Sequence, residues 1–346
     1  MARKTSTLKT LLGAGILLTA LAPSSGCLWL FGDGYDGAYI ESEDLSLEVP
    51  DQGFRAEGDQ GDLYLLCNET ADNTNSWVSS VVEVTGVVVE FLNNYRESSS
   101  EGAWRVYGPF DDNSSERDVA WMVKISGDAA DTAFEFWVGP RGETDAAAFE
   151  LLTEGSLSIE DEIRSGTMHI DFDTYENYPG LDYTLVWDYA GDITIDFERN
   201  VDSGEKTITI DYDNFVANRT GYLDDDSFQS DETYEYHLGG DKSGSFHLAL
   251  MGEWDTWPWT WSGPMQERMQ LDMVWNADQA GRAYGTITEV DGVGDMLHGD
   301  LELDECFDQS GGLSYRFLTQ VYADEVPDYE YNFGEAETCV VEQPGA

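Results

Sequence analysis

From residue 103 onward, apolar and polar residues alternate in short runs separated by Gly, Asp and Asn. A two-residue period is typical of strands with one buried face and one solvated face, and the short breaks are typical of antiparallel hairpins. Two of the predicted turns are Ala190-Gly191 and Val201-Asp202-Ser203-Gly204. The predicted strands cover residues 103–108, 118–126, 132–139, 146–152, 167–175, 183–189, 192–200, 205–215, 233–238, 245–252, 268–275, 283–290, 299–306, 314–322 and 329–333.

The pattern before residue 103 is different. Asp62–Cys67 is a short apolar run that we interpret as a first strand. In residues 76–96, large apolar side chains recur at helical spacing, at Trp77, Val81, Val84 and Val88. Their β-branched side chains favour a strand instead, but the spacing predicts a helix with a wide apolar face.

The resulting fold class is mainly β. Because no second helix of comparable quality follows, parallel crossovers are excluded and the strands must form a long antiparallel meander. So many strands must curl, and we predict a curved or partly open barrel with the helix of residues 76–96 packed on it. Asp171 and Asp196 lie in mid-strand, which argues against a transmembrane barrel. The layout is similar to the open-barrel fold of periplasmic lipoprotein carriers, an analogy of architecture alone.

The first residues predict the compartment. A basic start is followed by an apolar run at residues 11–22, which is the length of a signal peptide. The next residues, Ser24-Ser25-Gly26-Cys27, resemble the box of bacterial lipoprotein precursors. This resemblance implies that Cys27 carries lipid and, with Leu28 after it, that the protein is sorted to the outer membrane, facing either the periplasm or the cell surface. Ser24 stands where Leu is usual, so a secreted protein is the alternative.

The chain then divides into a signal peptide (1–26), an acidic, Gly-rich tether (27–61) and one β-rich domain (62–346). Cysteine usage fits an oxidising compartment. Besides Cys27, three cysteines remain, and we predict a disulfide between Cys306 and Cys339 because both lie among the C-terminal strands. Cys67 lies in an apolar run and is predicted to be buried.

The chain is strongly acidic, with 69 Asp and Glu against 17 Lys and Arg and a net charge of −52. This charge excludes nucleic acid and anionic lipid headgroups as partners. Hydrophobic residues make up 41%, too many for a disordered acidic chain. The acids are spread along the sequence, which favours a surface adapted to salt water, as in halophilic proteins; carboxylate sites for divalent cations are the competing interpretation.

A small repeat appears in three predicted strands, at His169–Asp173, Thr194–Glu198 and Thr209–Asp213. Alternation places its Ile and aromatic residues on one face and its carboxylates on the other. If the strands are neighbours, these acids share a surface, and a Ca²⁺ or Mg²⁺ site there is one hypothesis. Because flat sheet faces rarely supply the six to eight oxygen ligands of Ca²⁺, we predict instead a water-facing sheet surface without any cofactor. The candidate ligands are Asp171, Asp173, Asp196, Asp211 and Asp213.

Indole rings gather between residues 254 and 261. Tryptophans beside carboxylates can stack on sugar rings, anchor a loop at a membrane interface or simply pack a hairpin. The candidate residues for ligand or glycan contact are Trp254, Trp257, Trp259 and Trp261.

No catalytic motif occurs: there is no nucleophile elbow, zinc-binding helix or phosphate-binding Gly-Lys loop. We therefore predict a membrane-tethered lipoprotein that acts as a binding or structural module of the cell envelope, with another envelope protein as one partner. Two alternatives stay open. One is a glycan-binding or glycan-hydrolysing protein that uses the segment 254–261, and the other is a carrier of an apolar ligand between helix and sheet.

Overall fold

The computed structural model describes most of the chain after residue 39. The described residues are 40–50, 61–68, 70–72, 75, 96–112, 118–128, 130–179, 187–219, 227–230, 233–252, 267–289, 301–320 and 329–344.

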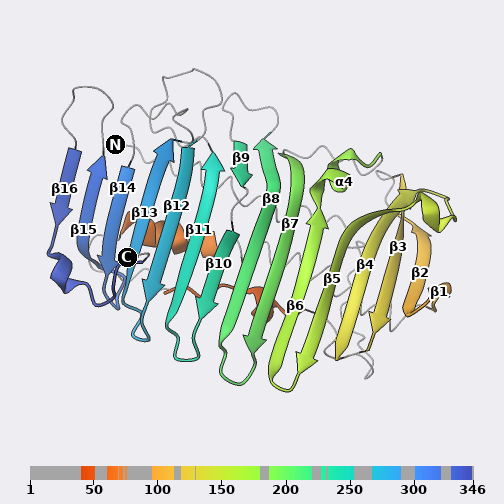
Figure 1. Ribbon diagram of the computed structural model, residues 1–346, viewed down its shortest axis with the longest axis horizontal. Coiled ribbons are helices and arrows are strands. Elements are labelled where there is room, and N and C mark those ends of the chain that lie inside the picture. Colours follow the sequence, from red (N-terminus) through yellow and green to blue (C-terminus); the bar gives the residue numbers. More distant parts are fainter. Residues whose placement is uncertain are drawn as a thin grey trace.

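One antiparallel sheet makes up most of this structure (Figure 1). Its strands are β1 (Ser99–Glu101), β2 (Trp104–Asp111), β3 (Val119–Gly127), β4 (Asp131–Pro140), β5 (Glu150–Glu160), β6 (Ile163–Asp171), β7 (Trp187–Asn200), β8 (Lys206–Arg219), β9 (Ser227–Ser230), β10 (Thr233–Leu238), β11 (Gly244–Gly252), β12 (Glu267–Trp275), β13 (Gly281–Glu289), β14 (Leu301–Phe307), β15 (Leu313–Gln320) and β16 (Tyr329–Phe333).

The strands follow one another in sequence order across the sheet, as a meander should. The exception is β9, which shares the position of β10 between β8 and β11. The sheet does not close, because β1 and β16 lie at its two ends (Figure 1). The prediction of a mainly β, antiparallel, open architecture is confirmed.

The strand β7 corrects one predicted turn. Ala190-Gly191 was expected to reverse the chain, but β7 continues through it with a bulge between Ala190 and Asp192. Gly191 has φ of +79°, which lies in the left-handed region that glycine adopts readily. Both tight turns and β-bulges use this conformation, so the glycine is compatible with either. The turn predicted at residues 201–204 does connect β7 and β8.

Two predicted strands begin or end in short helices instead. The first three residues of the strand expected at 146–152 form the 3-10 helix η3 (Ala146–Ala148), and residues after Asp171 form α4 (Phe172–Asn177). In each case an aspartate caps the helix: Asp145 accepts from Ala147 N, and Asp171 accepts from Thr174 N. Because a capped helical turn satisfies backbone donors locally, it competes with strand pairing at these positions.

Alternating side chains form the core on one face of the sheet, which we call the core face. Its buried residues come from nearly every strand and include Ile125, Phe134, Met168, Ile195, Ile210, Tyr236, Phe246, Leu271 and Phe307. The opposite face, which we call the outer face, is mostly polar. A small apolar cluster of Val106, Ala120, Met122 and Phe149 interrupts it near β2–β5.

The core face is covered by residues 40–50, which include the short helix α2 (Ser42–Leu45), and by residues 61–72; we call these two segments the N-terminal strap. In Figure 1 the strap runs behind the strands in the middle of the sheet. Ile40, Leu45 and Leu47 are buried, so this part of the predicted acidic tether packs on the sheet.

Residues 62–68 and 70–72 are helical, so the prediction of a strand at Asp62–Cys67 is wrong. Leu63, Tyr64, Cys67 and Ala71 are buried at helical spacing. The helix is favoured by a cap supplied from the sheet, because the Glu305 carboxylate accepts hydrogen bonds from the backbone N–H groups of Asp62 and Leu63. The helix expected at 76–96 lies outside the described residues, except for Arg96. None of the described helices is long and apolar enough to cross a bilayer.

Candidate functional site

Three basic side chains project from the core face and bind the part of the strap at and just after α2. Asp44, in α2, is fully buried, and both of its carboxylate oxygens accept hydrogen bonds from Arg164 Nε, at 3.1 and 3.0 Å. Arg164 Nη2 adds a further bond at 3.0 Å, and Arg199 Nη1 lies 3.1 Å from the same carboxylate. Two guanidinium groups therefore neutralise one buried carboxylate.

The third base, Lys206, binds the residues after α2. Its ammonium donates to the carbonyls of Ser46 at 2.6 Å and Glu43 at 3.2 Å, and lies 3.5 Å from the Glu48 carboxylate. Burial lowers the pKa of Lys206, while the Glu48 charge opposes this change. Burial alone would raise the pKa of Glu48, but Lys242 and Lys206 together lower it.

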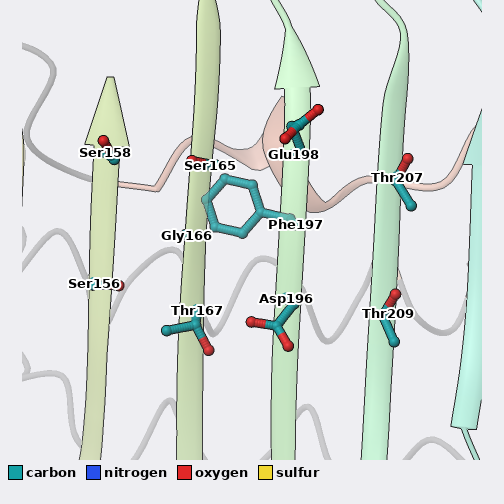
Figure 2. A pocket seen from close by; sticks show the side chains of 10 residues that line it. All are labelled: Ser156, Ser158, Ser165, Gly166, Thr167, Asp196, Phe197, Glu198, Thr207 and Thr209. Carbon is teal, nitrogen blue, oxygen red and sulfur yellow. The ribbon is translucent and has the colours of Figure 1, made fainter. Parts of the chain in front are cut away.

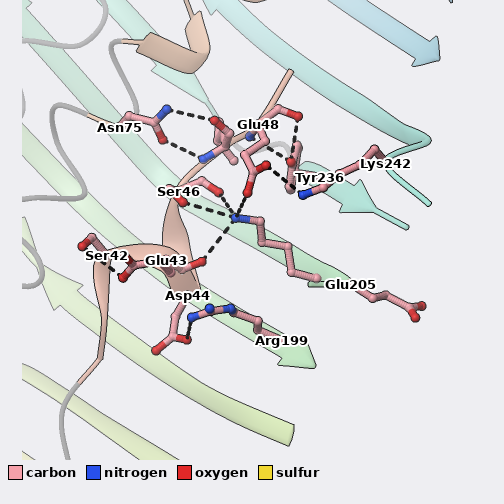
Figure 3. A network of polar contacts seen from close by, with 12 residues as sticks. Ser42, Glu43, Asp44, Ser46, Glu48, Asn75, Arg199, Glu205, Tyr236 and Lys242 are labelled. Atoms are coloured by element: carbon pink, nitrogen blue, oxygen red, sulfur yellow. Dashed lines mark hydrogen bonds and ion pairs between the residues drawn. The ribbon is translucent and has the colours of Figure 1, made fainter. Parts of the chain in front are cut away.

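Neutral contacts complete this attachment (Figure 3). The hydroxyl of Tyr236 accepts from Glu48 N at 2.9 Å and donates to Glu48 O at 3.1 Å. Asn75 makes two hydrogen bonds to the backbone of Leu47. Every charge on this part of the core face is thus paired with the strap, and we assign this network a structural role.

The outer face carries an open groove of about 400 Å³ over four neighbouring strands, β5–β8 (Figure 2). Hydroxyl groups and two carboxylates line it. The lining residues are Ser156, Ser158, Ser165, Gly166, Thr167, Asp196, Phe197, Glu198, Thr207 and Thr209.

Cross-strand register explains the order of these groups. Asp196 stands between Thr167 and Thr209 on the two adjacent strands. In the next row, Glu198 stands between Ser165 and Thr207 in the same way. Each carboxylate is therefore flanked on both sides by a hydroxyl, at a spacing where opposed side chains can hold one ligand together.

Small residues on β5 and β6 make the groove. Gly166 is opposite Phe197, and a Cβ at position 166 would lie 2.7 Å from the Phe197 ring. The ring occupies the core face over the glycine, so the floor of the groove is backbone rather than an exposed aromatic surface. Asp196 and Glu198 are exposed and, within the described part of the chain, make no hydrogen bond or ion pair. They are available to a ligand.

A second acidic group lies at one end of the same strands. Asp171, Asp192 and Asp213 are paired in register across β6, β7 and β8. Partial burial raises the pKa of Asp192, as do the charges of Asp171, Asp173 and Asp213, whereas His169 lowers it. The Nε2 atom of His169 is 3.1 Å from the Asp192 carboxylate.

The five candidate metal ligands are therefore distributed over the outer face and α4. Asp171 caps α4, Asp173 accepts from Gly191 N, and Asp211 accepts from the Thr233 hydroxyl. Asp196 lies in the groove, one cross-strand row from Asp211. Among the described residues, no group of three or more His, Cys, Asp or Glu is arranged to hold a metal ion.

Asp192 was not among the predicted site residues, because it precedes the repeat that begins at Thr194 in the same strand. The strap-binding bases were missed as well, although a signal existed: Arg164, Arg199 and Lys206 all fall in phase with the buried residues of their strands. A charged residue in the buried phase requires a partner, and that requirement points to a covering segment.

The cysteines and tryptophans singled out from the sequence are described only in part. Cys306 and Cys339 form a disulfide that ties the C-terminal segment to β14. Cys67 is a free, buried thiol, and burial raises its pKa far above the ordinary value. Cys27 and the four tryptophans between 254 and 261 lie outside the described residues.

Comparison with protein-family models, with characterised proteins and with solved structures finds no match to this chain.

Proposed function

We propose that this protein is a lipid-anchored module of the bacterial cell envelope that binds a hydroxyl-rich or cationic ligand on the outer face of its sheet and does not catalyse a reaction on it. The observation that carries the binding role is the groove of hydroxyls and exposed carboxylates over β5–β8. The N-terminal strap covers the core face over the middle of the sheet, so the polar outer face is the surface left for a ligand there.

The envelope location is supported by the sequence and by the cysteines. The signal-like residues 1–26 lead to the Ser24-Ser25-Gly26-Cys27 box. The Cys306–Cys339 disulfide is of the kind that persists in oxidising compartments. An anchor of several acyl chains on Cys27 would hold the protein firmly at a membrane.

The ligand chemistry follows from the lining. Carboxylates flanked by hydroxyls accept and donate hydrogen bonds and attract positive charge. An oligosaccharide containing free amino groups meets both requirements. The other two hypotheses, a glycan site at the tryptophans and an apolar ligand beneath the helix of residues 76–96, concern residues outside the described structure and stay predictions.

The anchor is tested by expressing the full chain in a bacterium supplied with labelled palmitate. We expect label on the wild-type chain and none on the Cys27→Ala variant, which should leave the detergent phase in a phase-partition assay. Ser24→Leu restores the residue usual in the box and should be labelled at least as well. Equal partition of the wild type and Cys27→Ala would contradict the anchor.

Ligand binding is tested by titration calorimetry with a glucosamine oligomer, which is cationic, and with the neutral N-acetylglucosamine oligomer. We expect the cationic oligomer to bind and the double variant Asp196→Asn/Glu198→Gln to lose at least tenfold in affinity. Asp278→Asn/Glu335→Gln removes the same charge from exposed positions away from the groove and is the control. An equal loss in both double variants, or no binding at all, would argue against a groove ligand of this class.

A further inference from the structure

The two edges of the open sheet differ in character. At one end, β1 consists of Ser99, Ser100 and Glu101, all exposed and none apolar. At the other end, β16 is a longer strand with the sequence Tyr-Glu-Tyr-Asn-Phe. A short polar strand is one of the ways in which proteins prevent pairing at a sheet edge. A longer strand rich in aromatic residues leaves its edge open to pairing with another strand.

Two aromatic side chains of β16 are exposed. Tyr331 is 43% exposed and Phe333 is 46% exposed, and they are two of the four large hydrophobic residues exposed in the described structure. Tyr331 is paired with Leu318 on β15, and Phe333 is paired with Arg316. Since opposed residues share a face, both aromatics extend the core face to the last strand of the sheet.

We propose that β16 pairs with β16 of a second copy of this chain, antiparallel and with the two-fold axis at Tyr331, so that two sheets join edge to edge. In this register Tyr331 is opposite its own symmetry mate, and Tyr329 of each copy is opposite Phe333 of the other. The third pair brings Glu330 of each copy opposite Asn332 of the other.

The sequence of β16 is compatible with pairing to a second copy of itself. An isologous interface requires that a surface be complementary to itself. Here Tyr331 meets Tyr331 of the other copy on the core face, and Phe333 lies opposite position 329; aromatic cross-strand pairs are favourable. On the outer face, the carboxylate of Glu330 meets an amide that can donate to it, and no pair of like charges is opposed.

The same edge also explains why assembly would stop at two copies. Pairing of β16 with β1 of another copy would be heterologous and would extend without limit. The three polar residues of β1 offer no aromatic partner, so this contact is disfavoured. In the two-fold dimer the two β16 strands pair with each other, so the two ends of the joined sheet are both β1 strands.

Charge determines the conditions under which the dimer forms. Each chain carries a formal net charge of −52, so two copies repel one another at long range. The Debye length falls from about 10 Å at 0.1 M salt to about 3 Å at 1 M, and the repulsion between copies falls with it. A five-residue strand pair is a small interface, so the dimer is weak at low salt and strengthens as salt is added.

The register is tested by disulfide crosslinking of the full chain under mild oxidation. At the two-fold axis, Tyr331→Cys places two thiols opposite one another and should give a covalent dimer on a non-reducing gel. Asn332→Cys places each thiol opposite Glu330 instead, and Ser100→Cys lies on the other edge; both should stay monomeric. Equal crosslinking of Asn332→Cys and Tyr331→Cys would overturn the proposed register.

The charge pairing is tested in the Tyr331→Cys background. Adding Asn332→Glu opposes two carboxylates twice per dimer and should lower the crosslinked fraction severalfold, whereas Asn332→Lys should raise it. Adding Glu330→Lys to the Asn332→Glu variant creates an attractive pair and should restore crosslinking. A crosslinked fraction that stays the same in all three variants would overturn the proposal.

Sedimentation velocity of the unmodified full chain, in detergent, gives the remaining test. We expect a monomer at 0.05 M NaCl and an increasing dimer fraction at 1 M NaCl. A monomer at every salt concentration would overturn the proposal. So would a monomeric Tyr331→Cys chain whose maleimide labelling is blocked by phosphatidylcholine vesicles, because that result would assign the strand to membrane contact.

Discussion

Arg164, on β6, holds the carboxylate of Asp44 in α2 with its Nε and Nη2 atoms, across 120 residues of sequence. Asp44 is fully buried, and its second partner, Arg199, lies on the adjacent strand β7. Two bases on neighbouring strands therefore converge on one acid of the strap. This arrangement fixes where α2 lies on a sheet that otherwise offers a long and repetitive apolar face.

Replacing Asp44 should destabilise the fold strongly. Asp44→Ala removes the buried carboxylate and leaves Arg164 and Arg199 with the more exposed and more distant carboxylate of Glu41, at 3.7 and 3.4 Å. Breaking a buried ion pair from one side costs about 3–5 kcal/mol. We expect a loss of this size in the free energy of unfolding, measured by urea denaturation. The control is Glu43→Ala, an exposed acid in the same helix, for which the change should stay within about 0.5 kcal/mol. Similar losses in both variants would argue against a specific role for Asp44.

Glu305 should make stability depend on pH. Its side chain is fully buried, and burial raises its pKa above 4.5, although Arg316 and the N–H groups of Asp62 and Leu63 oppose this change. The folded protein therefore holds this proton more tightly than the unfolded chain. The stabilisation is fully present below pH 4.5 and is lost as the pH rises through the folded pKa. We expect the stability difference between wild type and Glu305→Gln to grow as the pH falls from 7 to 4.5.

A carboxyl with the opposite shift provides the matched control for this titration. Hydrogen bonds from the Ser243 hydroxyl and backbone N–H lower the pKa of Asp241 below 3.8. The contribution of Asp241 is therefore present above pH 3.8 and declines as the pH falls through its folded pKa. The difference in the free energy of unfolding between wild type and Asp241→Asn should shrink in acid. In the same pH range, the corresponding difference for Glu305→Gln should already be at its full value. Parallel curves for the two variants would contradict both assignments.

The disulfide between Cys306 and Cys339 closes a loop with a sequence separation of 33. On the chain-entropy view, a loop of this length stabilises the fold by about 3–4 kcal/mol. The double variant Cys306→Ser/Cys339→Ser should lose about this much in guanidinium unfolding, and a reducing agent should have the same effect on the wild type. The reducing agent should not alter the double variant. Loss of stability in the double variant on reduction would show that another disulfide contributes.

Gly166 should resist even a methyl group. A Cβ there would lie 2.4 Å from the carbonyl oxygen of Ser156 and 2.7 Å from the Phe197 ring, both fixed parts of the sheet. We expect Gly166→Ala to cost about 1–3 kcal/mol in thermal or urea unfolding. Gly312→Ala is the control, because its nearest atoms, in the Asp308 side chain, lie at ordinary contact distance. A neutral Gly166→Ala would show that β5 and β6 can separate there.

The alternation of side chains predicted the meander well because it reports a local fact, namely which residues face the core. Ile193, Ile195 and Phe197 are buried on β7 as expected, and the alternate residues Asp196 and Glu198 are exposed on the outer face. The turn at Ala190-Gly191 was wrong for an equally local reason. A glycine with positive φ serves both a two-residue reversal and a bulge, and only the partner strand decides between them.

The errors near the N-terminus have a different origin. The run Leu63-Tyr64-Leu65-Leu66 suits a strand or a buried helix, and its helical form depends on a cap from Glu305, 243 residues away from Asp62. The groove could not be located from the sequence either. Its lining comes from four strands, and Ser, Thr, Asp and Glu are typical of any solvated sheet surface. The register that places Asp196 between two threonines exists only in the folded sheet.

The order of strands has a final consequence, for how such a molecule could form and change. Because almost every strand pairs with its neighbour in sequence, each hairpin can zip onto the previous one with a short closing loop, as in linear repeat arrays. Duplication or deletion of a hairpin would lengthen or shorten the sheet without rethreading the backbone. The strap limits this freedom, because it is bound to β6, β7, β8 and β14 at fixed positions along its own length. A change in the number of strands between β6 and β14 should therefore be tolerated less well than a change near either edge of the sheet.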